Sequence, residues 1–187
     1  MAVLIRWRRL RLALLLVPAF VAGARAQAGL EYEVKAAFLY NFMRFVEWPS
    51  ESPRAEQPFR VCLAGDDPFG GGLERTIGSD QIDGRPIVVE RVPIASVAAR
   101  CQIVFVPNSQ IANAAAVLRA LGTSPVLTVG ESSGFLQAGG MVNLIVDAGH
   151  VRFDVNVAAA TARGLKISSK LLRIARRTSG FSEDREH

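Results

Sequence analysis

The loop after the first expected strand combines acidic residues with glycines, residue types found at many phosphate sites. It contains Gly65-Asp66-Asp67-Pro68, and three glycines follow at positions 70–72. A glycine loop between a strand and a helix can hold a phosphate at the helix N-terminus. However, neither glycine-rich nucleotide signature is present, no lysine lies nearby, and two carboxylates repel an anion. We therefore interpret the loop as a turn in which Asp66 or Asp67 accepts a backbone N–H.

The chain offers few groups for acid–base or nucleophilic catalysis. Its histidines are His150, in an expected hairpin turn, and His187 at the last position. No G-x-S-x-G motif occurs, and Ser168-Ser169-Lys170 departs from the S-x-x-K pattern. A phosphate-accepting site would need another carboxylate after the third strand, where the sequence reads Phe105-Val106-Pro107-Asn108. The sequence therefore predicts a protein that is not an enzyme, with no cofactor and no metal.

Two cysteines remain for redox chemistry, Cys62 and Cys101. Their spacing is not the C-x-x-C of redox enzymes, and two thiolates with so few histidines do not complete a zinc site. In an oxidising compartment an even cysteine count favours a disulfide, worth about 4 kcal/mol for a loop of about 40 residues. The sequence predicts a structural disulfide and leaves open whether it also senses redox conditions.

Cations cluster near the end of the chain. A helix is expected over 169–177, with Ser168 as its cap and an apolar face formed by Leu171, Leu172 and Ala175. The opposite side would carry a basic face made of Lys166, Lys170, Arg173, Arg176 and Arg177. This pattern is typical of a core-facing helix whose cations complement its dipole. It also fits a surface that meets an acidic partner or anionic lipid headgroups, and the residues leave both interpretations open.

The first 26 residues have the parts of a secretory signal peptide. Arginines precede an apolar run from Leu10 to Ala22, and Ala24-Arg25-Ala26 is a cleavage pattern. The apolar run rises only about 20 Å as a helix, less than the hydrocarbon core of about 30 Å. We predict a signal peptide over 1–26, cleaved between Ala26 and Gln27. The product would be a periplasmic protein that is not embedded in the membrane.

The charge balance argues against nucleic acid as a partner. The 187 residues include 22 basic and 17 acidic ones, and five of the arginines lie in the first 26 residues, which hold no acid. Removing that segment leaves 17 basic against 17 acidic residues. A protein that binds a polyanion needs a basic excess in its folded part, which this chain lacks.

Hydrophobic periodicity predicts alternating strands and helices to position these groups. Strands are expected at 59–64, 87–92, 102–106, 126–129, 141–146 and 151–155. Helices are expected at 31–48, 111–121, 157–163 and 169–177, with a short piece ending at 77. We predict an α/β fold with one mixed β-sheet of about six strands flanked by helices. It forms a single domain over 27–177, followed by a flexible C-terminal tail over 178–187.

The first expected helix has an unusually broad apolar stripe. Val34, Phe38, Phe42 and Phe45 share one face, with Leu39, Met43 and Val46 beside them. Such a stripe is typical of a helix that packs on the core. Because it is wider than core packing needs, a docking surface is the alternative interpretation.

Several blocks of the chain resemble, in order, the pattern of the YfiR-like family of exported bacterial proteins. The first is Lys35-Ala36-Ala37-Phe38-Leu39-Tyr40-Asn41-Phe42, which leads to Phe45-Val46-Glu47-Trp48-Pro49. Later blocks lie at 61–70, at Cys101, at 127–129, at Phe135 with Gly139-Gly140, at 153–156 and at 165–172. The resemblance extends from Glu33 to Arg177, nearly the whole chain after the signal peptide.

The resemblance implies a periplasmic, non-enzymatic regulator that binds and inhibits an inner-membrane diguanylate cyclase through its periplasmic part. Such inhibition lowers cyclic di-GMP signalling and biofilm formation. The resemblance also implies sequestration by a peptidoglycan-associated outer-membrane lipoprotein, a homodimer, and a disulfide that Cys62 and Cys101 could form. An alternative of another class is a periplasmic module that binds a small solute or an envelope polymer and reports to a receptor or transporter.

Overall fold

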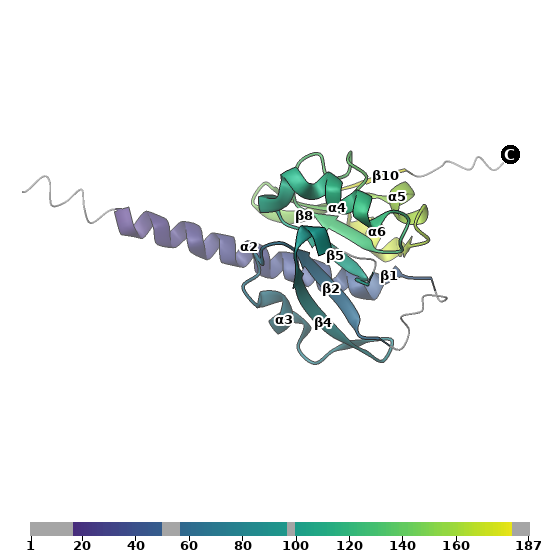
Figure 1. Cartoon of the computed structure of the whole chain (residues 1–187). Coiled ribbons are helices and arrows are strands. Elements are labelled where there is room, and N and C mark those ends of the chain that lie inside the picture. The colour runs from purple at the N-terminus through teal and green to yellow at the C-terminus, as the bar shows by residue number, and fades with distance from the viewer. Residues whose placement is uncertain (1–16, 50–56, 97–99, 181–187) are drawn as a thin grey trace, which may run out of the picture.

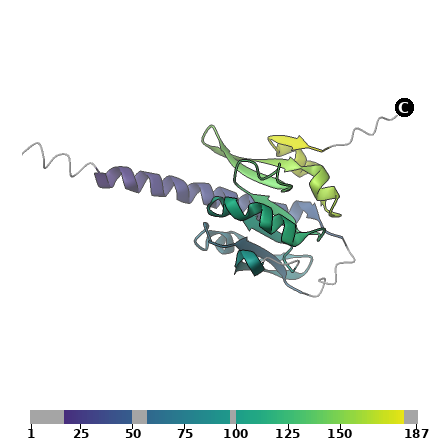
Figure 2. The same ribbon diagram turned by 45° about the horizontal axis from the view of Figure 1, so that its top comes forward.

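Helices cover both faces of one mixed sheet, as Figure 1 and Figure 2 show from two directions. The computed structural model of the chain describes residues 17–49, 57–96 and 100–180. The strands of this sheet are β2 (Phe59–Ala64), β3 (Gln81–Ile82), β4 (Arg85–Val92), β5 (Ile103–Val106), β6 (Leu127–Gly130), β7 (Val142–Asp147), β8 (His150–Asn156) and β10 (Arg177–Ser179). Their spatial order is β10-β8-β7-β6-β5-β2-β4-β3.

The centre of the sheet is parallel and its edges are mixed. Strands β4, β2, β5, β6 and β7 run parallel to one another, whereas the β7–β8 hairpin and the short β3–β4 pair are antiparallel. The predicted α/β class with a mixed sheet is confirmed. The eight strands exceed the expected six because β3 and β10, at the two edges, are only two and three residues long. Such short segments have no detectable periodicity.

The helices form two layers. They are α2 (Val17–Phe45), α3 (Gly72–Ile77), α4 (Ala114–Leu121), α5 (Val157–Thr161) and α6 (Ser169–Ile174), with short 3-10 helices η1 (Ile94–Ser96) and η2 (Asn108–Asn113). Helix α4 packs on the face that carries Cys62 and Val104, and α2 packs on the face that carries Leu63 and Phe105. Because β5 is buried on both faces, all four of its residues are apolar.

Helix α2 runs antiparallel to the central strands. Near its middle, Tyr32 contacts Phe69, which follows β2, with ring centroids 5.5 Å apart. Just after its end, Trp48 contacts Phe59, the first residue of β2, with ring centroids 5.1 Å apart. Between these points Phe42 packs edge-on against Phe153 of β8. The half of the helix from Tyr32 onward therefore spans the sheet from the carboxyl ends of its parallel strands to their amino ends.

The predicted first helix is wrong at its C-terminal end. It stops at Phe45 rather than Trp48, and the next two residues form strand β1 (Val46–Glu47). Strand β1 pairs antiparallel with β9 (Lys166–Ile167), and the amide of Ser168 donates to the Phe45 carbonyl at 3.0 Å. Sequence periodicity missed this change because the partner strand lies about 120 positions downstream.

The predicted last helix is also too long. Helix α6 ends at Ile174, because Ala175 is extended and the amide of Arg176 donates to the Phe153 carbonyl at 2.8 Å. Residues 177–179 then form β10, parallel to β8. The predicted flexible tail therefore includes two residues of a strand, and its remainder from 181 onward lies outside the described residues. The predicted cap is confirmed, since the Ser168 side chain accepts from the amide of Leu171.

Candidate functional site

A cleft opens where the end of α2 meets the amino ends of the central strands. It encloses about 760 Å³, within the range of natural ligand pockets. Its walls come from α2, β1, β2, the β3–β4 turn and β9. The lining residues are Met43, Arg44, Val46, Glu47, Trp48, Pro49, Phe59, Gln81, Ile82, Asp83, Arg85, Gln102, Gly164 and Lys166. Aromatic rings, both signs of charge and two side-chain amides thus share a single concave surface.

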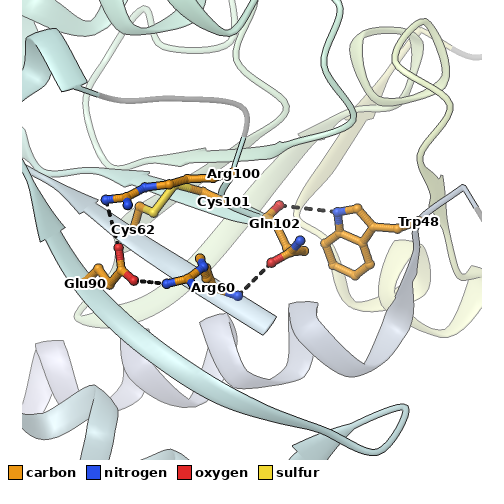
Figure 3. Close-up of a disulfide and its surroundings, with 7 residues drawn as sticks. All are labelled: Trp48, Arg60, Cys62, Glu90, Arg100, Cys101 and Gln102. Carbon is orange, nitrogen blue, oxygen red and sulfur yellow. Dashed lines mark hydrogen bonds and ion pairs between the residues drawn. A yellow bond between two sulfur atoms is a disulfide. The ribbon is translucent and has the colours of Figure 1, made fainter. Parts of the chain in front are cut away.

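Trp48 and Gln102 form one side of the cleft. The indole Nε1 of Trp48 donates to the Gln102 carbonyl at 3.3 Å, as Figure 3 shows. Gln102 is only 3% exposed, and its side-chain Oε1 accepts from the amide of Arg60 at 2.6 Å. This side-chain bond takes the place of a backbone partner at the start of β2. The aromatic wall is therefore fixed to the sheet through a buried amide.

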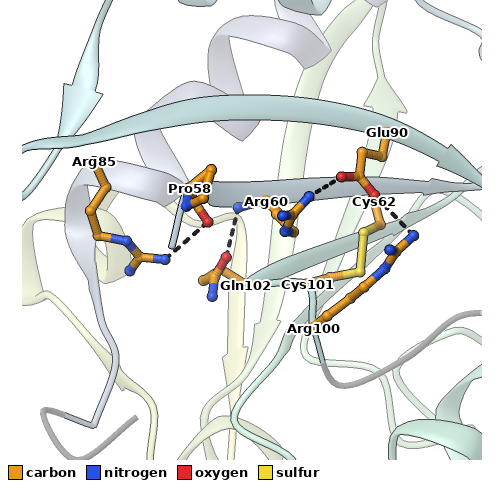
Figure 4. A network of polar contacts seen from close by, with 8 residues as sticks. All are labelled: Pro58, Arg60, Cys62, Arg85, Glu90, Arg100, Cys101 and Gln102. Atoms are coloured by element: carbon orange, nitrogen blue, oxygen red, sulfur yellow. Dashed lines mark hydrogen bonds and ion pairs between the residues drawn. A yellow bond between two sulfur atoms is a disulfide. The ribbon is translucent and has the colours of Figure 1, made fainter. Parts of the chain in front are cut away.

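Arg85 forms the other side. Its guanidinium donates to the carbonyls of Gln57 and Pro58, at 2.6 and 3.1 Å, and lies over the Phe59 ring. Figure 4 shows the bond to Pro58 beside the amide contact of Gln102. Bonds to two carbonyls and stacking on a ring hold an arginine at its cleft position. Lys166 faces no such constraint, since it is exposed in β9 and forms no ion pair within the described part of the chain.

The disulfide lies directly behind this cleft. Cys62 in β2 and Cys101 before β5 are bonded, with their Cα atoms 5.9 Å apart, and both are fully buried. The predicted pairing is therefore present. Next to it, Glu90 of β4 pairs with Arg60 and with Arg100, whose Nη2 lies 3.0 Å from the carboxylate (Figure 3). The disulfide links β2 to the segment just before its parallel neighbour β5, at the end of the sheet where the cleft opens.

The predicted basic face does not form one surface. Arg176 binds Asp154 through two hydrogen bonds of 2.9 and 2.5 Å, which leaves its charge compensated. Lys166 lies in β9, opposite Glu47 of β1, and lines the cleft. Lys170 and Arg173 are exposed on α6, and Arg177 is exposed in the edge strand β10. The face is divided because the helix expected over 169–177 ends at 174. Arg176 therefore lies between the helix and β10, and Arg177 lies in β10 itself.

The acidic loop forms a structural turn, as the sequence indicates. Asp67 accepts from the amide of Phe69 at 2.8 Å and pairs with Arg91 of β4. Asp66 accepts from the Ser109 hydroxyl at 3.3 Å. His150 lies in the β7–β8 hairpin, where its Nδ1 is 3.0 Å from the Ala148 carbonyl. Within the described residues, no group of three or more histidine, cysteine or acidic side chains could hold a metal.

One ion pair that the sequence did not reveal closes the carboxyl end of the sheet. Lys35 of α2 is buried, with its Nζ 2.6 Å from Glu131 and 2.5 Å from Glu31. Glu131, which follows β6, also accepts from the Tyr32 hydroxyl and from the amide of Asn108. The two charged residues lie 96 positions apart, so no local sequence pattern indicates that they form a pair.

The N-terminal predictions are only partly within the described residues. Residues 1–16 of the predicted signal peptide lie outside them, and α2 continues through positions 26 and 27, where cleavage is predicted. Among the helices that the structure describes, none is long and apolar enough to cross a membrane. The cleavage position stays a prediction.

Comparison with known families identifies the domain. Residues 32–176, well over half of the chain, match the YfiR/HmsC-like family. The chain belongs to the YfiR/HmsC-like family. The match confirms the resemblance seen in the sequence blocks and covers both cysteines and every described strand of the sheet except β10.

Two solved structures share the fold at low identity. A conserved domain protein from Vibrio cholerae superposes with a TM-score of 0.55 at 11% identity, over 79% of this chain and 60% of that one. An ABC domain in complex with L-Trp from Streptococcus pneumonia gives a TM-score of 0.50 at 12% identity, over 65% and 55%. The YfiR/HmsC-like chain thus spans under two thirds of each matched structure. At these identities the likeness concerns the fold alone.

Proposed function

We propose that this protein is a periplasmic, non-enzymatic regulator that binds the periplasmic part of an inner-membrane diguanylate cyclase and holds the cyclase inactive. The result is lower cyclic di-GMP signalling and less biofilm. The observation that carries the proposal is the family match over residues 32–176. A second proposed partner is a peptidoglycan-associated outer-membrane lipoprotein that sequesters the regulator and so releases the cyclase.

To act in this way, the regulator must bind the inactive cyclase more tightly than the active cyclase, and it needs a surface for this binding. A binding protein shifts a cyclase a hundredfold toward its inactive state only if it binds that state better by about 2.7 kcal/mol. Tryptophan and arginine are enriched at the energetic centres of protein interfaces. The cleft presents Trp48, Arg85 and Lys166 together on a support fixed by the disulfide and by Gln102. We therefore assign cyclase binding to the cleft.

The test compares two exposed lysines in living cells. We expect deletion of the gene to raise cellular cyclic di-GMP and the wild-type gene to restore it. Lys166→Glu, in the cleft, should fail to restore the low level, whereas Lys170→Glu, on α6 outside the cleft, should behave as wild type. Immunoblots of the periplasm check that both variants reach equal abundance. Failure of Lys170→Glu alone would move the binding surface to α6, and an unchanged level after deletion would contradict the proposal.

The cleft volume also supports an alternative, a module that binds a small solute or an envelope polymer and reports to a receptor or transporter. A volume of about 760 Å³ accommodates a ligand of drug-like size. Thermal unfolding of the purified protein with peptidoglycan fragments and with small metabolites separates the two functions. A rise in melting temperature without any protein partner would favour this alternative.

A further inference from the structure

Strand β4 leaves most of its outer edge without a partner strand. The strand has eight residues, but β3 pairs only with Arg85 and Pro86. On its inner side β4 pairs with β2 over residues 87–92. Among the described strands, none borders 87–92 on the outer side, and Figure 1 shows β4 at the lower border of the sheet. An open edge of this length is a template for a further strand.

One hydrogen bond shows which backbone groups face this open edge. The amide of Gly65 donates to the carbonyl of Val92 at 2.9 Å, so the backbone groups of Val92 face β2. Successive residues of a paired strand direct their N–H and C=O groups to opposite sides, so Glu90 also faces β2. Val89 and Arg91 therefore direct their amides and carbonyls to the outer side, where no described strand receives them.

The side chains along the edge are suited to strand pairing. Ile87, Val88 and Val89 are half-buried, and Ile87 and Val89 pack against the core on the α2 face. Edge strands are commonly protected by a lysine, a bulge or a proline. Pro86 does not protect this stretch, because it lies before it and opposite Gln81 of β3.

Arg91 determines the charge that a pairing strand has to bring. Its side chain is 54% exposed, it pairs with Asp67, and it lies 3.7 Å from Glu74. Residues directly opposite in an antiparallel pair are close neighbours, and opposite charges there are stabilising. The fitting strand carries an acidic residue opposite Arg91 and apolar residues opposite Val89 and Ile87. Because β4 runs the other way, the strand reads acid-x-apolar-x-apolar from its N-terminus.

The edge is held in place from behind. Cys62 of β2, which forms the disulfide, lies opposite Glu90 in the register of the two strands. Figures 3 and 4 show Glu90 bridging Arg60 and Arg100 beside the disulfide. A strand fixed in this way needs little ordering when it binds, which lowers the entropic cost of association.

Two occupants from this chain itself fit the edge less well. Residues 181–187 follow β10, which is six places from β4 in the sheet order. These residues span at most about 25 Å when extended, whereas six strand spacings amount to about 29 Å. A second copy would bring its own outward-facing residues, and none of these is acidic. They are Arg85, Ile87, Val89 and Arg91.

We propose that the open edge of β4 binds an extended segment of another protein by antiparallel strand addition. The bound segment places an acidic residue opposite Arg91 and apolar residues opposite Val89 and Ile87. The proposal does not depend on the regulatory function proposed above. The cleft variant Lys166→Glu leaves β4 unchanged, so the two surfaces can be tested separately.

The first test measures amide hydrogen exchange of the purified protein by NMR, with its disulfide formed. The probe is the peptide acetyl-Thr-Glu-Thr-Val-Thr-Val-Thr-amide. We expect it to slow exchange of the Val89 and Arg91 amides by about tenfold or more, because both become hydrogen-bonded. The Glu90 amide, which faces β2, is the internal control and should not change. Unchanged exchange at Val89 and Arg91 with the peptide at about 1 mM would overturn the proposal.

The second test uses N-methylated peptides to separate strand addition from contacts of side chains alone. N-methylation of the first valine should weaken binding by about tenfold or more, because its N–H donates to the Val89 carbonyl. N-methylation of the threonine between the valines should leave binding unchanged, since that N–H points away from β4. Equal losses for both peptides would contradict strand addition.

The third test examines the charge opposite Arg91. Arg91→Gln should weaken binding of the glutamate peptide about threefold, whereas a peptide with glutamine in its place should bind both proteins equally. Unfolding midpoints check that the variant remains folded, because Arg91 also pairs with Asp67. A peptide of reversed sequence should bind more weakly, and equal binding of the two orders would overturn the antiparallel arrangement.

Exchange in the free protein identifies the competing occupants. Protection of Val89 and Arg91 that increases with protein concentration would assign the edge to a second copy. Protection that is lost when residues 181–187 are removed would assign it to the end of the chain. Either result would overturn the proposal.

Discussion

At the scale of single residues, Asp67 shows how a possible reactive group is used for structure. Burial opposes its ionisation, but the hydrogen bonds from Arg91 and from the amide of Phe69 outweigh this and lower the pKa of the carboxyl. Within the described residues, the neighbouring Asp66 has only the longer contact with Ser109. The loop thus depends on one ionised carboxylate, which closes the turn after β2 and joins it to β4.

We expect Asp67→Asn to lower the free energy of unfolding by about 1 kcal/mol at neutral pH, through loss of a charged hydrogen bond. Because the folded-state pKa is below the unfolded one, this stabilisation is present above the ordinary aspartate pKa of about 4 and disappears as pH falls through the lowered value. Urea unfolding curves of the variant and the wild type should therefore converge in acid. Asp66→Asn is the control and should match the wild type; a pH-independent difference for Asp67→Asn would refute this account.

At the scale of elements, the position of α2 depends on contacts at its C-terminal end and near its middle. Strand β1 and Trp48 hold the C-terminal end, and the Lys35–Glu131 pair holds the middle. Burial together with the charge of Glu131 raises the pKa of Tyr32, so that its hydroxyl stays protonated and donates to the carboxylate. A buried pair of this kind is costly to break because the remaining charge has no water to solvate it.

We expect Lys35→Met to destabilise the fold by about 3 to 5 kcal/mol, because Glu131 would stay buried without its cation. Adding Glu131→Gln should recover much of the loss, since both charges are then removed. Glu31→Gln, which removes only the half-exposed neighbour, should cost no more than about 0.5 kcal/mol. Urea unfolding measures all three, and hydrogen exchange should report faster opening of the turns of α2 around position 35 in Lys35→Met. Equal effects for the Lys35 and Glu31 variants would contradict the assignment.

At the scale of the whole molecule, the disulfide closes a covalent loop between two central strands of the domain. Cys62 and Cys101 are 39 positions apart, and the segment between them includes α3, β3 and β4, so the bond joins the central strands around one edge of the sheet. In the chain-entropy account the bond stabilises the fold by restricting the unfolded chain. The whole domain, including the cleft beside the bond, should therefore lose stability when it is absent.

We expect Cys62→Ala combined with Cys101→Ala to lower the free energy of unfolding by about 4 kcal/mol. Alanine avoids placing a hydroxyl at two fully buried positions. Melting the wild type with and without a reductant is the parallel measurement, and the double variant should not respond to the reductant. Identical melting temperatures for reduced and oxidised wild-type protein would show that the bond adds no stability.

Features that depend on neighbours along the chain could be predicted from the sequence. The apolar runs at β2, β5 and β6, the hairpin at 147–150 and the Ser168 cap all follow from local patterns, and the structure contains each of them. The ends of α2 and α6 could not be predicted in this way. Each helix yields to a strand whose hydrogen-bond partner is remote, and such pairing leaves no periodic signal.

The sequence by itself determined the α/β class, the family, the pairing of the cysteines and the lack of a recognisable catalytic motif, because these depend on composition, spacing and short-range order. Only the tertiary structure decided that the cations at the end of the chain are divided among three elements. It also decided that Lys35 lies against Glu131 and that Trp48, Arg85 and Gln102 share a cleft. The physical reason is that chain folding brings these groups together over tens of residues, at distances that no local pattern encodes.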